Sequence, residues 1–344
     1  IYKMQRVSLK FLAKELGIAE GTVSRALNDY PDISEATRER VKEVAKKFNY
    51  KANQNARRLA TGVAEAVAYL MPPNTHAISE PFVSQLLEGL GSSLAKRGWD
   101  LLVVQASSPE TEAETVEKLS SSGKVSGVVI SRPYKEDRRI ELLKKYNVPF
   151  IVHGRSVNSE DYAWYDVDGE KAFHDGVGIL AELGHQNIAF IGAPTDYNFG
   201  QMRLDGYRRG LASNNLTLDE AIIKIVDMSD DAGAAATAKM LGLPHPPTAI
   251  LCATDTQAFG ALAAIREAGL TPGIEVSVLG YDGLDFGKHT NPPLTTMAQP
   301  QSHSGEEICD MLLAIIDGGN PVDYQELRSA ILVRRMSVGP VRPQ

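Results

Sequence analysis

The sequence predicts an N-terminal all-α head and, behind it, an α/β core of two parallel-sheet sub-domains. The first 62 residues or so read as one short helix after another, with no strand pattern between them. From about Pro72 onward, short β-rich apolar runs alternate with amphipathic helices, the pattern of repeated βα units around a parallel sheet. At roughly 100–200 residues per domain, the length of 344 residues suits two or three domains.

Charge separates the same two parts of the chain. The whole sequence has a formal net charge of −7, which alone would argue against a nucleic-acid partner. Residues 1–62, however, hold 13 Lys and Arg against 7 Asp and Glu, so the head carries +6 and residues 63–344 carry −13. Such an asymmetry indicates contact with nucleic acid by one end only.

Three helices are expected in the head, over residues 9–16, 21–28 and 34–48. Pro31 and Asp32 break the second helix, and Ser34 is a plausible N-cap of the third. A polar segment follows, with a further small helix over 54–60. We therefore divide the chain into a head over 4–50, a linker over 51–63 and a core over 64–344.

The first two helices have matching apolar stripes. Positions 9, 12, 13 and 16 form one stripe, positions 23, 26 and 27 form the other, and Gly17 permits a sharp turn between them. That arrangement is a helix-turn-helix, whose second helix enters the major groove of DNA with its N-terminal residues. Polar side chains opposite the stripes can bind phosphates. The residues expected to face DNA are Ser8, Leu9, Glu20, Gly21, Thr22, Ser24, Arg25, Asn28, Ser34, Thr37 and Tyr50.

Two series of strands and helices make up the predicted core. The first has strands over 66–71, 101–106 and 127–130, with helices over 82–97, 111–121 and 139–146. The second has strands over 188–192, 222–226, 248–253 and 276–280, with helices over 169–183, 202–213, 232–241 and 256–267. A helix over 306–316 and a strand over 330–333 follow. So many crossovers favour two sub-domains, one of about 64–165 and 298–324, the other of about 166–297 and 325–340.

A set of motifs runs through head and core in one register. The head contains Val7-Ser8-Leu9, Gly17-Ile18, Thr22-Val23-Ser24-Arg25-Ala26-Leu27-Asn28, Asn49-Tyr50 and Ala56-Arg57-Arg58-Leu59-Ala60. The core contains Gly184-His185, Ala253-Thr254-Asp255, Gly280-Tyr281-Asp282 and Pro293-Leu294-Thr295-Thr296. Together they resemble the signature of the LacI/GalR family of bacterial transcription regulators. The resemblance implies a periplasmic-binding-protein-like core, with its ligand in a crevice at the carboxyl ends of the strands.

By that resemblance, residues 53–60 form a hinge helix that folds when a dimer binds its operator. Leu59 would be the side chain that wedges into the minor groove, where an apolar wedge kinks DNA at the cost of unstacking a base step. The alternative is that Leu59 packs against its own domain. Asn53, Ala56, Arg57 and Leu59 thus complete the expected DNA contacts.

The chain departs from the family pattern at a few positions. Ala19 stands where family members usually carry a Ser or Thr N-cap. Glu20 and Gly21 occupy the pair that most often chooses the base sequence. Glu20 could accept a hydrogen bond from cytosine, or it could be a first-turn carboxylate favoured by the helix dipole. In the core, Gly154 replaces an Asp of several relatives, so the ligand and the operator sequence both stay open.

The resemblance and the strand ends together give the expected effector site. Arg and Asp side chains offer directional hydrogen bonds to sugar hydroxyls, and aromatic faces cover the C–H surface of a ring. An Asp after a buried strand could instead cap the next helix, which is the alternative for Asp168 and Asp255. Trp164 could instead belong to the core. The expected residues are Phe82, Arg155, Trp164, Asp168, Tyr197, Phe199, Arg203, Asp255, Asp282 and Gln299.

Signatures of catalysis and of metal binding are missing from the sequence. The match of Gly176 and Gly178 to a dinucleotide fingerprint lies inside a helical pattern, and no Walker loop or nucleophile elbow occurs. Seven His and two distant Cys show no metal-ligand spacing. We therefore expect no enzyme activity, no cofactor and no metal. Few Cys and no apolar run approaching the roughly 18 residues of a membrane span suit a cytoplasmic protein without membrane contact.

These features predict a sequence-specific DNA-binding transcriptional regulator. It would be a repressor whose affinity for a palindromic double-stranded DNA operator is controlled by a small-molecule effector, a sugar, bound between the core sub-domains. A symmetric operator requires a homodimer, and the residues after Met336 show no heptad pattern for a tetramer. Two alternatives stay open: a purine-responsive regulator of the same family, and a sugar-binding carrier protein without DNA function.

Overall fold

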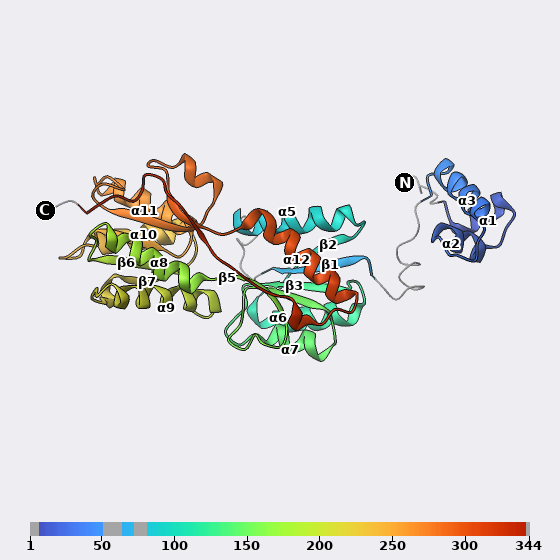
Figure 1. Cartoon of the computed structure of the whole chain (residues 1–344), viewed down its shortest axis with the longest axis horizontal. Helices are drawn as coiled ribbons and strands as arrows, with labels where there is room; N and C mark the ends of the chain where they lie inside the picture. Colours follow the sequence, from blue (N-terminus) through green and yellow to red (C-terminus); the bar gives the residue numbers. More distant parts are fainter. Residues whose placement is uncertain (1–6, 51–63, 72–80, 107, 342–344) are drawn as a thin grey trace. The chain divides into compact units, whose positions relative to one another are not determined.

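The computed structural model describes residues 7–50, 64–71, 81–106 and 108–341 (Figure 1), without the side chains of residues 109, 110, 301 and 302. The chain forms two compact units, Ile1–Glu65 and Ala66–Gln344, which are described separately below. Within the described ranges, none of the helices combines the length and the apolar character needed to cross a bilayer.

The described residues of the head form three helices, two of which begin at a capping serine. The helices are α1 (Leu9–Leu16), α2 (Glu20–Leu27) and α3 (Glu35–Lys47). The Ser8 hydroxyl accepts from the backbone N–H of Phe11 at 3.1 Å and begins α1, and Gly17 ends it with φ of 67°, a left-handed conformation that glycine adopts without strain. The predicted apolar stripes form the core of the head, with Leu12, Ala13, Leu16, Val23, Ala26, Val41 and Ala45 buried together.

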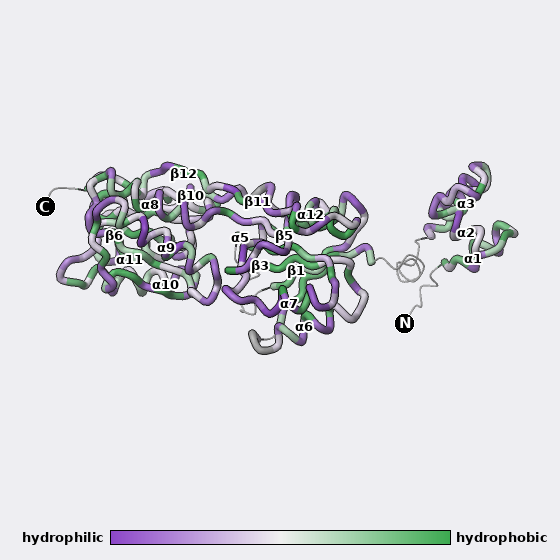
Figure 2. Tube along the Cα trace, turned by 60° about the horizontal axis from the view of Figure 1, so that its bottom comes forward, coloured by the Kyte–Doolittle hydropathy of each residue, from purple (hydrophilic) through white to green (hydrophobic). Residues whose placement is uncertain are grey.

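The first sub-domain of the core is a six-stranded sheet in the order β11-β5-β4-β3-β1-β2. Its strands are β1 (Ala66–Met71), β2 (Asp100–Gln105), β3 (Gly127–Ser131), β4 (Phe150–His153), β5 (Ala163–Val167) and β11 (Gln325–Arg328), all parallel. Alternate residues of β1 point to opposite faces. Val67 and Tyr69 pack under α5 (Pro81–Lys96) and α12 (Gln301–Ile316), whereas Ala68 and Leu70 pack under α6 (Pro109–Ser122) and α7 (Arg138–Lys145). Burial on both faces explains why the central strands β1 and β3 are almost entirely apolar, as Figure 2 shows.

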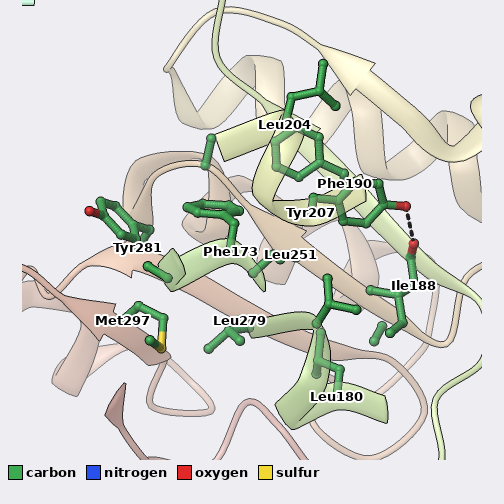
Figure 3. Packing of buried hydrophobic residues seen from close by; sticks show 14 of the residues in the cluster. Phe173, Leu180, Ile188, Phe190, Leu204, Tyr207, Leu251, Leu279, Tyr281 and Met297 are labelled. Atoms are coloured by element: carbon green, nitrogen blue, oxygen red, sulfur yellow. Dashed lines mark hydrogen bonds between the residues drawn. The ribbon is translucent and has the colours of Figure 1, made fainter. Parts of the chain in front are cut away.

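The second sub-domain repeats this plan in the order β12-β10-β9-β8-β6-β7. Its strands are β6 (Ile188–Gly192), β7 (Ile223–Ile225), β8 (Ala249–Cys252), β9 (Ser277–Asp282), β10 (Thr295–Ala298) and the antiparallel β12 (Ile331–Val333). Helices α8 (Gly169–Glu182) and α9 (Asn198–Ser213) cover one face, and α10 (Asp230–Leu241) and α11 (Asp255–Glu267) cover the other. Figure 3 shows the hydrophobic cluster between this sheet and helices α8 and α9, where Phe173, Phe190 and Tyr207 pack together. The Tyr207 hydroxyl donates to the Ile188 carbonyl oxygen at 2.8 Å.

The chain crosses between the two sheets after β5, after β10 and after β11. The crossing after β11 falls later than predicted. We expected the second sub-domain to resume at residue 325, but Gln325–Arg328 pairs with Trp164–Val167 as an edge strand of the first sheet. At the edge of the sheet, the side chains of β11 are only partly buried, so this strand lacks the apolar run by which the other strands were recognised.

Candidate functional site

The outer face of α2 carries the residues expected to read bases. Glu20, Gly21, Arg25 and Asn28 are exposed, while Val23 on the opposite side is fully buried. Thr22 and Ser24 are partly buried at the edge of this face. Among the described residues, no side chain caps the start of α2 at Ala19. The N–H groups of Thr22 and Val23 donate to the Ala19 carbonyl oxygen, which leaves those of Glu20 and Gly21 for an acceptor such as a phosphate.

Of the other residues in the head that were predicted to contact DNA, some cap helices and others pack against the core of the head. Ser8 caps α1, and Ser34 caps α3 while its hydroxyl lies 2.8 Å from that of Thr37. Leu9 and Tyr50 pack, partly buried, against the head core, and burial raises the pKa of Tyr50. Asn53, Ala56, Arg57 and Leu59, the expected hinge contacts, lie outside the described residues.

The core holds a cleft that is open to solvent and encloses about 740 Å³ of empty space, solvent included. It lies at the carboxyl ends of strands from both sheets, including β3, β4 and β9. We call it the central cleft. Its lining residues are Pro81, Phe82, Ser131, Arg132, Pro133, His153, Gly154, Arg155, Asp166, Phe199, Met202, Arg203, Met228, Thr254, Thr256, Asp282, Leu284 and Gln299.

Arg203 enters the central cleft from α9 and is almost fully buried. One terminal nitrogen, Nη1, donates to the Ala253 carbonyl oxygen at 2.7 Å. The guanidinium lies 4.1 Å from the ring centre of Tyr281 and 4.6 Å from that of Phe199. Its Nε is buried and has no hydrogen-bond partner among the residues that the structure describes. A buried cation with an unused donor is suited to a polar ligand atom.

A carboxyl and an amide meet at the end of β9. The Gln299 amide donates to Asp282 Oδ1 at 2.8 Å, and Asp282 has φ of 124°, a strained conformation for a residue with a side chain. Burial raises the pKa of Asp282, and the neighbouring Arg203 opposes that rise. Asp282 and Gln299 thus offer an acceptor and an amide at the same wall of the cleft.

The first sheet supplies a second charged pair. Arg155 Nε donates to Asp166 Oδ2 at 2.8 Å, and the Arg155 guanidinium lies 5.0 Å from the ring centre of Trp164. Burial raises the pKa of Asp166, and the ion pair with Arg155 opposes that rise. Asp166 was not among the predicted residues, because it lies inside a strand that reads as core; its polarity in the run Ala163–Val167 was the available signal.

A stacked aromatic pair forms another part of the cleft wall. The rings of Phe82 and His153 lie 5.4 Å apart and 12° from parallel. Burial, with a contribution from Arg132, lowers the pKa of His153 to about 4, so the imidazole is neutral at pH 7. Arg132 itself has φ of 52°, and the neighbouring Ser131 Oγ is buried with no hydrogen-bond partner in the described part of the chain. Strained backbone and an unused hydroxyl at the end of β3 are typical of a binding site.

Four of the ten predicted effector residues do not line the central cleft: Trp164, Asp168, Tyr197 and Asp255. Asp168 caps α8 by accepting from the Lys171 N–H at 2.9 Å, which is the helix-capping role given above as the alternative to ligand binding. Asp255 accepts from the backbone N–H groups of Gly283 and Leu284 at 2.9 and 2.7 Å, so it ties down the loop after β9. The cap of α11 is Thr254 instead.

The two aromatic residues of that group support the cleft from outside. The Trp164 indole donates to the Ser159 carbonyl oxygen at 3.0 Å and carries Arg155 on its face. Tyr197 stacks between Tyr134 at 5.1 Å and Phe199 at 5.7 Å. Phe199 lines the cleft, so Tyr197 contacts a lining residue.

Gly154, the departure from the family pattern, has a local structural reason. Its φ of 106° is unfavourable for any residue with a side chain, and an added Cβ would lie 2.8 Å from Cδ of Pro133. The first sheet therefore offers no side chain at this place. Arg155 and Asp166 provide its charges instead.

No group of three or more His, Cys, Asp or Glu that could hold a metal ion occurs in the described parts of the chain. The two Cys residues are buried and free. Burial raises the pKa of both thiols, which disfavours the reactive thiolate.

Known proteins match both units. A family model described as "Bacterial regulatory proteins, lacI family" matches residues 8–53, and one described as "Periplasmic binding protein-like domain" matches residues 177–338. The HTH-type transcriptional regulator AglR of Rhizobium meliloti is 38% identical over 338 residues, 97% of this chain and 95% of AglR. The regulator CelR of Thermobifida fusca is 31% identical, over 92% of this chain and 94% of CelR.

A solved structure of the lac repressor dimer, bound to operator and an anti-inducer, matches with a TM-score of 0.86 and 28% identity, over 97% of this chain and 100% of the repressor chain. A CelR–cellobiose complex matches with a TM-score of 0.74 and 29% identity, over 96% and 99% of the two chains. The two-part fold predicted from the sequence is thereby confirmed. The chain belongs to the LacI family of bacterial regulatory proteins and is an HTH-type transcriptional regulator.

Proposed function

We propose that this protein is a repressor that binds a palindromic double-stranded operator as a homodimer and responds to a small carbohydrate in the central cleft. The observation that carries the proposal is the composition of that cleft. It joins the buried charged groups of Arg203 and Asp282 and the partly buried amide of Gln299 to the aromatic faces of Phe82 and Phe199. Directional polar groups between apolar ring faces suit a sugar, whose edges carry hydroxyls and whose faces carry C–H groups.

The division of the lining between two sheets supports a regulatory role for the ligand. Arg155 and Asp166 come from the first sub-domain, whereas Arg203 and Asp282 come from the second. A sugar that contacts both sub-domains favours one relative orientation of them. By linkage, a ligand that prefers one orientation changes operator affinity, typically by about 5- to 150-fold. The hinge residues Asn53, Ala56, Arg57 and Leu59 would transmit that orientation to the heads.

A ligand panel tests the effector class. The full chain is melted with monosaccharides, disaccharides and purines, each with and without a DNA fragment selected for binding. A ligand at 100 times its dissociation constant stabilises the native state by about 2.7 kcal/mol. Stabilisation by a sugar, lost in an Arg203→Lys variant that keeps its melting temperature without ligand, supports the proposal, since Lys lacks the fork of donors. Stabilisation by purines alone would contradict it.

The DNA function has its own test. Operator affinity is measured at several salt concentrations, and a steep fall with salt is expected because each subunit releases counterions from several phosphates. The head supplies the positive charge, and the second helix supplies the base contacts. Affinity without salt dependence, or equal affinity for all DNA fragments, would contradict the repressor assignment and leave a sugar-binding carrier.

A further inference from the structure

Arg25 is the cation on the exposed face of α2, and residues beyond the end of that helix hold it. We propose that Asp32 and Tyr30 are positioning residues for Arg25: they fix its guanidinium so that it discriminates one base pair of the operator. The inference deepens the proposed DNA function and rests on it. Asp32 and Tyr30 act here through Arg25 and need no DNA contact of their own.

Two contacts hold the guanidinium. Asp32 forms an ion pair with Arg25, in which both side chains are about half exposed. The Arg25 guanidinium also lies 5.8 Å from the ring centre of Tyr30, within the range of a cation–π contact. Together, the carboxylate and the ring restrict the direction and the plane of the guanidinium N–H groups, which are the features that bidentate recognition of a base requires.

The backbone carries these two residues back to α2. Asp29 turns the chain with φ of 56°, and the Tyr30 N–H then donates to the Arg25 carbonyl oxygen at 3.1 Å. The Ile33 N–H donates to the Tyr30 carbonyl oxygen at 3.2 Å and closes the next turn. A backbone hydrogen bond therefore ties this segment to Arg25, the residue whose side chain Tyr30 and Asp32 contact.

The helix itself offers Arg25 little support. Position 21, one turn earlier on the same face, is glycine and has open space around it. Asn28, on the same face near the end of the helix, donates its amide to the Ser24 carbonyl oxygen at 2.8 Å. Because neighbours on the helix do not fix Arg25, its orientation depends on Asp32 and Tyr30.

The expected effect is on discrimination rather than on stability. Ordering one long side chain at an interface reduces affinity by about 2- to 12-fold, and a pre-ordered Arg25 avoids that loss. This gain in affinity applies to the matching base pair, which binds the guanidinium N–H groups of Arg25. It does not apply to a mismatched base pair, which leaves those groups unbound. An exposed ion pair contributes little to folding, so the stability of the head should hardly change when Asp32 is replaced.

The experiment compares two isosteric charge removals in the full chain. A preferred palindromic sequence is selected from a random DNA library with the unchanged protein, and Arg25→Ala then identifies the base pair that loses discrimination. Asp32→Asn is the test variant. Asp29→Asn is its matched control, because Asp29 lies in the same turn as Asp32, has similar exposure, and pairs with Lys42 at 2.5 Å rather than with Arg25. Tyr30→Ala, with Tyr30→Phe as control, tests the ring independently.

Both Asp→Asn variants should bind all DNA somewhat more tightly, since each removes a negative charge near the phosphates. Only Asp32→Asn should also lower the ratio of matched to mismatched affinity at the Arg25 base pair, by about 2- to 12-fold, with unchanged ratios at other positions. Equal ratios in Asp32→Asn and Asp29→Asn, or an Arg25→Ala variant that affects no single base pair, would overturn this inference alone. An unchanged protein that selects no sequence would overturn the proposed function as well.

Discussion

Replacement of Asp255 provides a demanding test of how the central cleft is held together. This side chain is fully buried and accepts three hydrogen bonds: Oδ2 from the N–H groups of Gly283 and Leu284, and Oδ1 from the Thr296 hydroxyl at 2.7 Å. Asp255→Ala leaves the buried Leu284 N–H and Thr296 hydroxyl without this acceptor, whereas the partly buried Gly283 N–H keeps a longer bond to the Thr296 hydroxyl oxygen at 3.3 Å. At about 1–3 kcal/mol for each unsatisfied group, we expect a loss of about 2–4 kcal/mol in the free energy of unfolding, the lower part of the summed range because the loop can relax toward water.

Asp255→Asn should behave differently. Its amide oxygen can accept from the two N–H groups, and its NH₂ can donate to the Thr296 oxygen once that hydroxyl turns. Burial, with a contribution from the neighbouring Asp282, raises the pKa of Asp255 above its ordinary value of 3.8. A folded-state pKa above the unfolded one means that the native state holds more protons, so wild-type stability falls as the pH rises through that folded-state pKa. An amide does not titrate. The cost of Asp255→Asn should therefore be smaller at about pH 8 than at about pH 5.

Urea denaturation of both variants and the unchanged chain, followed by circular dichroism at those two pH values, measures these differences. Thr296→Val serves as a control that removes one of the three donors together with its hydroxyl, and we expect it to cost about 1 kcal/mol. If Asp255→Ala cost less than the control, the three hydrogen bonds would not be holding the loop. If Asp255→Asn kept the pH dependence of the unchanged chain, Asp255 would not be the group that titrates.

The remaining predictions concern the cleft wall and the linker. The His153→Asn variant should lose less stability than the unchanged chain on acidification from about pH 6.5 to pH 4. The pKa of His153 is lowered to about 4, so between these pH values the native state of the unchanged chain binds fewer protons than its unfolded state. Equal loss of stability with acid in unfolding experiments on the two proteins would contradict this. Gly154→Ala should destabilise the core by about 2–4 kcal/mol through its positive φ and the approach to Pro133, measured as a lowered urea midpoint, and a change within error would refute it. Leu59→Ala should weaken operator binding and leave sugar binding intact; equal operator affinity would argue against a minor-groove wedge.

The sequence was sufficient for features that depend on local pattern. The stripes of Leu12, Val23 and Ala26 predicted the helix-turn-helix because burial in a small helical head follows helical spacing. Arg203 and Gln299 were found because the family resemblance, together with the meeting of strand carboxyl ends at one edge of a parallel sheet, placed them in the effector site.

Features that depend on the direction of a side chain could not be predicted from the sequence. Asp255 and Asp282 both stand at strand ends, yet one binds backbone N–H groups and the other lines the cleft. Only three-dimensional coordinates separate those cases, since both carboxylates have the same local sequence signal. Asp166 was missed for a related reason: it lies within a strand otherwise made of buried residues, and its partner Arg155 comes from the preceding segment of the chain.

The contacts between the sub-domains show how a ligand can act on the whole core. Beside the cleft, the Lys135 N–H donates to the Asp196 carbonyl oxygen at 3.2 Å and the Asn198 N–H donates to the Pro133 carbonyl oxygen at 3.0 Å. Tyr197 stacks on Tyr134 at the same place. These contacts stabilise one orientation of the two sheets, so the core already has an orientation that a ligand can favour or oppose.

A ligand that spans Arg155 and Arg203 in this orientation adds its own contacts to that set and favours the orientation further. Because linkage is reciprocal, operator DNA must then change the affinity for that ligand by the same factor as the ligand changes the affinity for DNA. Weakening the stack with Tyr134→Ala lowers the population of this orientation before the ligand binds. The apparent affinity for the ligand falls with that population, even though Tyr134 is not among the lining residues of the cleft.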